Sequence, residues 1–97
     1  MPTFISLFNF TEQGARALKD TAKRADAITK AVKKTGVSIR EVYWTLGQYD
    51  GVLVFDAPDD ETATAMMMGI GRMGNIRSQT LRAFSRDEIG GILAKVK

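Results

Sequence analysis

The chain has 97 residues, 44% hydrophobic and 26% charged, with a formal net charge of +3 and neither cysteine nor histidine. This length predicts one domain, residues 1–97, that buries only about two-thirds of its unfolded surface, so a second copy sharing the core would stabilise it. Without cysteine or histidine the chain has no disulfide framework and lacks the commonest general base and transition-metal ligand, so we expect no metal site and no cofactor.

The first predicted element is a strand at residues 3–10, TFISLFNF, which is rich in aromatic and β-branched side chains. Alternation places its side chains in two sets on opposite faces: Ile5 and Leu7, and Phe4, Ser6 and Phe8. Because both sets are largely apolar, we expect this strand to be covered on both sides.

A long basic helix is predicted next, with Thr11 as its N-cap and Gly36 just beyond its C-terminus. One apolar stripe recurs at spacings of three and four: Ala15, Leu18, Ala22, Ala25, Ile28 and Val32. The positive charge of the chain is concentrated here, in pairs with i,i+4 spacing: Glu12–Arg16, Asp20–Arg24 and Asp26–Lys30. A solvated helix face explains these charges, and since no aromatic RNA-binding strand accompanies them, no nucleic-acid partner is expected.

A hairpin and a second helix follow. Strands are predicted at residues 37–46 and 51–57, and the short connection from Gly47 to Asp50 indicates an antiparallel pair. The acidic residues after Pro58 open the helix, because negative charge is favourable at a helix N-terminus. Its buried stripe is predicted to contain Ala63, Met66 or Met67, Ile70 and Met73.

The last two elements are a strand and a short helix. The second helix is predicted to end at Gly74 and Asn75, before a fourth strand at residues 76–84. Ser85 and Glu88 have the spacing of a capping box, which predicts a short C-terminal helix after that strand.

The element order β-α-β-β-α-β, with a short C-terminal helix, predicts an α+β fold of the ferredoxin-like type with a four-stranded antiparallel sheet. Two helices cover one face of such a sheet, and the other face is expected to carry Phe4, Phe8 and Phe84. A monomer rarely exposes so much apolar surface. The expected partner is therefore the chain itself, as a homodimer or a higher oligomer of dimers.

Two other partners are not expected. The longest apolar run, residues 65–71, is far shorter than the roughly 20 residues that span a bilayer, and the first residues lack the pattern of a signal peptide. We therefore expect no membrane partner and a cytoplasmic location. Residues 69–74, GIGRMG, match a dinucleotide-binding pattern in letters only, because they lie late in a predicted helix and lead into a strand.

The hairpin connection LGQYDG, residues 46–51, allows two interpretations. As turn chemistry, Gly47 and Gly51 permit positive φ, and the carboxylate of Asp50 accepts a backbone N–H from its own loop, with Tyr49 packed at the rim of the barrel. As a reactive site, the carboxylate faces a cleft, short of hydrogen-bond partners, beside Tyr49 and the aromatic Trp44.

Four segments, NFTEQG, LKDTAKRADA, EVYWTLGQYDGVLVFDAPDDE and GNIRSQTLRAF, together resemble the GYD-domain family of small bacterial proteins of unassigned activity. The resemblance runs from residue 3 to about residue 89, and the naming signature falls on Gly47, Tyr49 and Asp50 with Gln48 between them. It implies the dimeric α/β-barrel superfamily, whose members include cofactor-free monooxygenases, muconolactone-type isomerases and stress-induced barrel proteins.

The first functional hypothesis is a homo-oligomeric barrel that binds a small apolar or aromatic ligand without catalysis. The residues predicted to bind that ligand are Phe8, Asn9, Trp44, Tyr49, Asp50 and Arg82. The alternative is a cofactor-free monooxygenase or isomerase acting on a small aromatic or quinone-like compound. In that case the catalytic candidates are Asp50 or Tyr49 in proton transfer and Arg82 in stabilising an enolate.

A third hypothesis concerns Pro2. If Met1 is removed, the chain begins with a secondary amine that leads directly into a strand, which resembles the tautomerase superfamily. The N-terminal proline of those enzymes is the general base.

Overall fold

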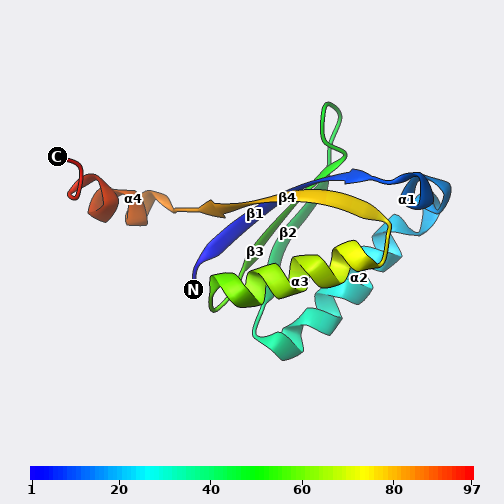
Figure 1. Ribbon diagram of the computed structural model, residues 1–97, viewed down its shortest axis with the longest axis horizontal. Helices are drawn as coiled ribbons and strands as arrows, with labels where there is room; N and C mark the ends of the chain where they lie inside the picture. The colour runs from blue at the N-terminus through cyan, green and yellow to red at the C-terminus, as the bar shows by residue number, and fades with distance from the viewer.

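A computed structural model describes all of residues 1–97 (Figure 1). Its strands and helices follow each other in the order that the sequence predicted. The strands are β1 (Thr3–Phe10), β2 (Ser38–Trp44), β3 (Gly51–Asp56) and β4 (Ile76–Ala83). The helices are α1 (Glu12–Arg16), α2 (Thr21–Val32), α3 (Asp60–Arg72) and α4 (Arg86–Leu93). All strand pairs are antiparallel, in the order β2-β3-β1-β4. The fold is α+β and ferredoxin-like, as the sequence predicted.

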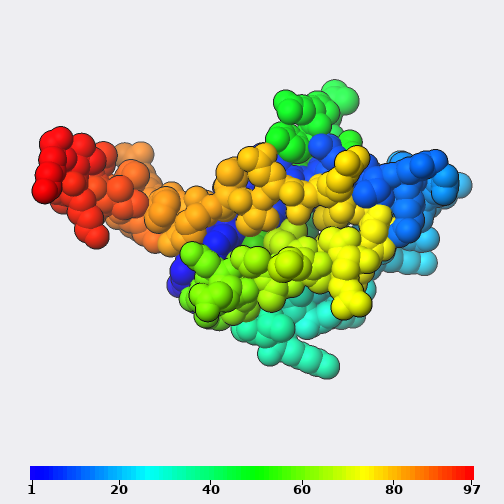
Figure 2. Space-filling model, viewed as in Figure 1, coloured from blue at the N-terminus to red at the C-terminus, as the bar shows by residue number.

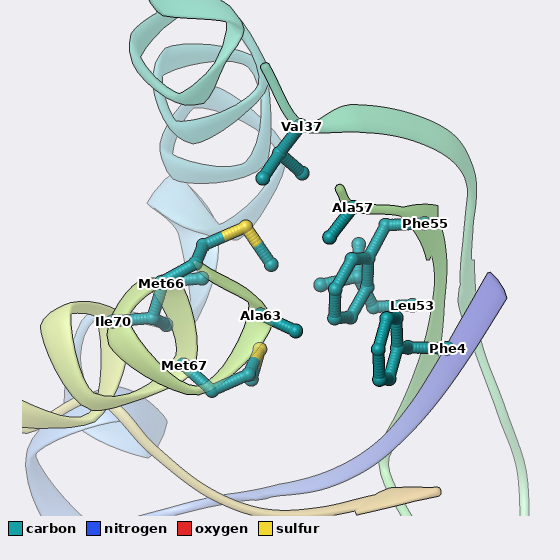
Figure 3. Packing of buried hydrophobic residues seen from close by; sticks show 9 residues of the cluster. All are labelled: Phe4, Val37, Leu53, Phe55, Ala57, Ala63, Met66, Met67 and Ile70. Atoms are coloured by element: carbon teal, nitrogen blue, oxygen red, sulfur yellow. The ribbon is translucent and has the colours of Figure 1, made fainter. Parts of the chain in front are cut away.

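The core lies between one face of the sheet and the two helices α2 and α3 (Figures 1 and 3). Phe4 of β1 and Phe55 of β3 are paired across the strands and stack with their ring centroids 5.4 Å apart. Side chains of α3 point toward them, and partly buried residues of α2 complete the packing. The buried cluster consists of Phe4, Val37, Leu53, Phe55, Ala57, Ala63, Met66, Met67 and Ile70.

The placement of Phe4 and Phe8 on the uncovered face was wrong. Both are buried on the helix-covered side, opposite Phe55 and Gly51 respectively. The uncovered face is still apolar, because the other alternating set occupies it: Ile5, Leu7, Val52, Val54 and Leu81. Alternation separated the two sets correctly, but only the position of α3 decided which set the helices cover. We call this second set, on the side away from the helices, the open face.

The predicted long helix is in fact broken into α1, a 3₁₀ turn at Leu18–Asp20, and α2. Thr11 caps α1 as expected, since its hydroxyl accepts the N–H of Gly14 at 3.1 Å. A Cβ on Gly14 would lie 2.0 Å from the carbonyl oxygen of Asn75, so α1 is held tightly against the turn before β4. The chain must therefore bend before it runs under the sheet. The bend leaves Leu18 exposed, and only the later part of the apolar stripe, Ile28 and Val32 of α2, packs against the core.

The chain ends in an arm that leaves the body of the molecule. Ser85 and Glu88 form the predicted capping box at the start of α4. Figures 1 and 2 show α4 and the C-terminus well away from α2 and α3, and the molecule measures 50 × 32 × 18 Å. Three apolar side chains of this arm are exposed: Ile89, Leu93 and Val96. Neither this helix nor any other is long and apolar enough to cross a membrane.

Candidate functional site

A cavity of about 80 Å³ lies between the helix-covered face of the sheet, α2 and α3. Twelve of its 16 lining residues are hydrophobic, so its walls are apolar. The larger wall residues are Phe8, Phe10, Ile28, Trp44, Met67 and Met73. Its polar lining consists of Ser6, Thr21, Arg24 and Asn75, none of which is acidic.

Three aromatic side chains form one end of the cavity. Phe8 and Phe10 lie on the same side of β1 and meet edge to face, with centroids 5.9 Å apart. Trp44, at the end of β2, reaches across to α2, where its indole Nε1 donates a hydrogen bond to Oγ1 of Thr21 at 3.1 Å. This bond fixes the indole between the sheet and the helix. Phe8 and Trp44 are thus the two predicted ligand-binding residues that line this cavity.

Arg24 lines the cavity and was missed by the sequence-based prediction. It was expected to form an ion pair with Asp20, and it does not, although the Glu12–Arg16 pair does form. Instead, Nη1 of Arg24 donates to the carbonyl of Ala17 at 2.8 Å, and Nη2 is buried without a hydrogen-bond partner. Arg24 precedes Ile28 by four residues and therefore shares the inward face of α2, a spacing that could have identified it.

Asp50 of the signature holds the hairpin against β1. Its Oδ2 accepts the backbone N–H of Phe10 at 2.8 Å, and its own N–H donates to the carbonyl of Phe8 at 2.8 Å and to Oδ1 of Asn9 at 3.1 Å. The expectation that the carboxylate binds an amide of its own loop was wrong, because its partner is 40 residues away in the sequence. The carboxylate also does not line the cavity.

The connection between β2 and β3, residues 45–50, projects from the end of the hairpin (Figure 1). Thr45 closes it through two bonds, from its N–H to the carbonyl of Asp50 at 2.9 Å and from its hydroxyl to the carbonyl of Tyr49 at 2.6 Å. The hydroxyl of Tyr49 donates to Oε1 of Gln79 on β4 at 3.1 Å. Leu46 is fully exposed at the tip of this loop.

Arg82 lies far from the signature residues. It is paired with Phe4 near the start of β1, six residues from Phe10, a separation of about 20 Å along a strand. Its guanidinium lies 4.4 Å from the ring centroid of Phe84, and its Nη2 is 3.8 Å from the carboxylate of Glu88. The structure therefore brings Asp50 and Asn9 together but separates Arg82 from both.

Two other stretches considered as sites, Pro2 and residues 69–74, belong to the framework of the fold. Pro2 accepts the N–H of Ala57 through its carbonyl and does not line the cavity. Gly69 and Gly71 of the GIGRMG stretch lie inside α3, as predicted, where their amides belong to the helix. No group of three or more acidic side chains is close enough together to hold a metal ion.

The chain is similar to a described family, to a curated protein and to a solved structure. The family model described as GYD domain matches residues 4–93. A Thermus thermophilus protein named glutamine synthetase and cystathionine beta-lyase binding protein is 31% identical over 98 residues, covering 100% of each chain. A crystal structure of a Thermus thermophilus protein matches the fold with a TM-score of 0.55 at 24% identity, covering 88% of this chain and 95% of that one.

Proposed function

This chain belongs to the GYD-domain family, and on that basis we propose that it is a single-domain binding protein. It holds a small apolar or aromatic ligand in the cavity between the sheet and the helices, and it self-associates through the open face of the sheet. The observation that carries this proposal is the cavity itself, with three aromatic walls and no acidic lining residue.

The size and lining of the cavity favour a small ligand. A water molecule needs roughly 10–15 Å³ of such space, so about 80 Å³ is room for several waters or for a single ring or short chain. Drug-sized ligands occupy sites of about 300 Å³ or more. Met67 and Met73 line the cavity, and their flexible thioether chains can adapt to ligands of different shape.

Self-association is supported by the open face and by the arm. Ile5, Leu7 and Leu81 lie together there because Leu7 follows Ile5 by two residues and Leu81 is paired with Ile5 across β1 and β4. The sheets of two copies packed face to face would cover these side chains. The C-terminal arm extends from the body of the molecule, so its exposed apolar side chains can contact a second copy in the same assembly.

Catalysis receives less support than binding. A general base must lie within hydrogen-bond reach of the proton it removes. Neither Asp50 nor Tyr49 lines the cavity, and the carboxylate of Asp50 is already held by the N–H of Phe10. A cofactor-free monooxygenase or isomerase would therefore need a second pocket at the signature loop.

Binding to another protein is a second candidate, because the relative matched over its full length is named as a protein that binds two enzymes. The loop of residues 45–50 projects from the body and carries the fully exposed Leu46, so it is accessible to a partner's surface. This candidate concerns the outer surface, so it is compatible with a ligand in the cavity.

Ligand binding is tested with neutral single-ring compounds, benzamide and benzyl alcohol, titrated into ¹⁵N-labelled protein. We expect saturable amide shifts at the cavity lining, together with a change in the fluorescence of Trp44, the only tryptophan. The variant Ala25→Leu fills the cavity and should abolish the shifts, whereas Ala22→Leu, at an exposed position of the same helix that does not line the cavity, should leave them unchanged. Shifts of equal size in the two variants would contradict the proposal.

A further inference from the structure

We propose that the ligand of this cavity is a small monoanion, a carboxylate joined to an apolar or aromatic body, and that Arg24 is its counter-ion. This inference rests on the proposed ligand-binding function and adds the charge of the ligand to it. It follows from the hydrogen bonding of the guanidinium, from the charge of the cavity lining and from the position of Arg24 on its helix.

The guanidinium of Arg24 donates fewer hydrogen bonds than its N–H groups allow. A guanidinium carries five N–H groups, and the single hydrogen bond of Arg24 runs from Nη1 to the carbonyl of Ala17. Its Nη2 is buried without a partner, the only such atom in the chain. Buried polar groups are nearly always paired, so an unpaired one at a cavity indicates a missing acceptor.

No protein group supplies that acceptor. Arg24 is the only charged residue in the cavity lining, and it takes part in none of the three ion pairs of the chain. Asp20, one turn earlier, was the residue expected to neutralise it, and no ion pair joins the two. The cavity therefore holds one uncompensated positive charge among apolar walls, an arrangement that favours an anionic ligand.

The position of Arg24 in α2 also favours a bound anion. It is the fourth residue of that helix, near the N-terminus, where the helix dipole favours negative charge and disfavours a cation. An anion bound beside Arg24 would be stabilised both by the guanidinium and by this end of the helix.

A second donor is available on the same face. Oγ1 of Thr21 already accepts the indole N–H of Trp44, so its own proton remains free to be donated. Thr21 and Arg24 are three residues apart on α2 and lie on neighbouring positions of its surface. A carboxylate has two acceptor oxygens and could take one bond from the guanidinium and one from the hydroxyl.

The other end of the ligand must be apolar. The aromatic side chains of Phe8, Phe10 and Trp44 form walls against which a ring can stack or pack edge to face. Because the cavity is small, we expect one ring or a chain of a few carbons rather than a fused ring system. A monoanion fits better than a dianion, since only one cation lines the space.

The experiment compares benzoate with benzamide, which share a ring and a shape but differ in charge. Dissociation constants are measured near neutral pH from the fluorescence of Trp44 and from amide shifts. We expect benzoate to bind at least about tenfold more tightly than benzamide, because only benzoate carries the negative charge that pairs with the guanidinium of Arg24. In Arg24→Gln this preference should fall below about twofold, because the affinity for benzoate falls more than the affinity for benzamide. Arg24→Lys should retain part of it, since lysine keeps the charge without the planar fork.

The matched control is Lys23→Gln, which removes one positive charge from the adjacent, exposed position of the same helix. It should leave the preference for benzoate intact. Equal binding of the two compounds, or a preference that persists in Arg24→Gln, overturns the inference and leaves the ligand-binding function standing. Failure of both compounds to bind overturns the proposed function and the inference with it. Melting temperatures of all variants establish that each is folded.

Discussion

At the scale of single residues, the signature Asp50 and the strand residue Phe10 are joined by one short hydrogen bond between a carboxylate and a backbone N–H. The bond ties the last residue of β1 to the hairpin loop, and it explains an acidic residue at this position without any catalysis. Gly51, the next residue, is required for another reason. A Cβ there would lie 2.1 Å from the ring of Phe8, although its φ is not positive.

We expect Asp50→Asn to lower the free energy of unfolding by less than about 1 kcal/mol, because the amide oxygen can still accept the N–H of Phe10. Asp50→Ala removes the acceptor and should cost about 1–3 kcal/mol. Urea unfolding measures both values, and hydrogen exchange of the Phe10 amide locates the effect. If Asp50→Asn proved as costly as Asp50→Ala, the charge rather than the hydrogen bond would be the important property.

Gly47 differs from Gly51 although both belong to the same loop. Its φ of 141° lies in the region that favours glycine, as the turn interpretation predicted, and there is open space around its missing side chain. The two glycines are therefore needed for backbone conformation in one case and for close packing in the other. Sequence patterns do not distinguish these causes, because both appear as a glycine beside a turn.

At the scale of elements, helix α4 depends on its first turn. The N–H of Ser85 donates to the carboxylate of Glu88, and Oγ of Ser85 accepts the N–H of Glu88 in return. The backbone and then the side chain of Ser85 hold the pKa of Glu88 below its usual range, and nearby Arg82 lowers it further. The same arginine contacts Phe84 and so connects the sheet to the arm.

This lowered pKa predicts a pH dependence for α4. The carboxylate of Glu88 stabilises the helix at every pH above its unfolded pKa of about 4.3, and this contribution is lost as the pH falls through the lower folded pKa. We expect the Ser85 amide to lose protection from hydrogen exchange below that pH. Glu88→Gln keeps the capping interaction without a titrating group, so its Ser85 amide should show no such transition. An identical transition in that variant would assign the effect to another group.

Tertiary contacts of α1 explain why the predicted long helix is broken. Local periodicity favoured one continuous helix, but α1 is fixed by tertiary contacts: the hydroxyl of Thr11 bonds to the carbonyl of Gly74, and Gln13 bonds to Met73 and Asn75. These partners are about 60 residues away in the sequence. Helix α1 therefore ends soon after the residues that make these contacts, and α2 begins in a new direction.

At the scale of the whole molecule, one face of the sheet and one helical arm remain without a covering layer (Figures 1 and 2). The open face carries Leu81 with 42% of its surface exposed, and the 3₁₀ turn between α1 and α2 carries Leu18 with 49% exposed. Because the two leucines are similarly exposed, a charge at either site should have little effect on folding of the monomer.

We expect the wild-type chain to sediment as a dimer or a larger assembly at micromolar concentration. Leu81→Glu should shift it toward monomer, because a charge on the open face would be buried without a partner in the assembly. Leu18→Glu, which changes charge and volume identically, should leave the assembly intact. Sedimentation velocity measures the size of the assembly for the three proteins, and a monomeric wild type would contradict self-association through this face.

The sequence by itself determined the order and type of the elements, most of their ends, and the family. These features depend on neighbouring residues: the alternation of β1, the caps at Thr11 and Ser85, the acidic start of α3 after Pro58, and its end at Gly74. Each is a short-range preference of the backbone or of a side chain next to it, so it can be recognised in a short segment of sequence.

The tertiary structure alone decided which apolar face of the sheet is covered, where the carboxylate of Asp50 binds, and that Arg24 turns from solvent toward a cavity. Each of these depends on residues that are distant in the sequence and meet only after the helices pack on the sheet. For Arg24 the deciding groups come from α2, the sheet and α3 together. The candidate site was therefore only partly predictable: Phe8 and Trp44, which line the cavity, were among the predicted ligand-binding residues, and Arg24 was not.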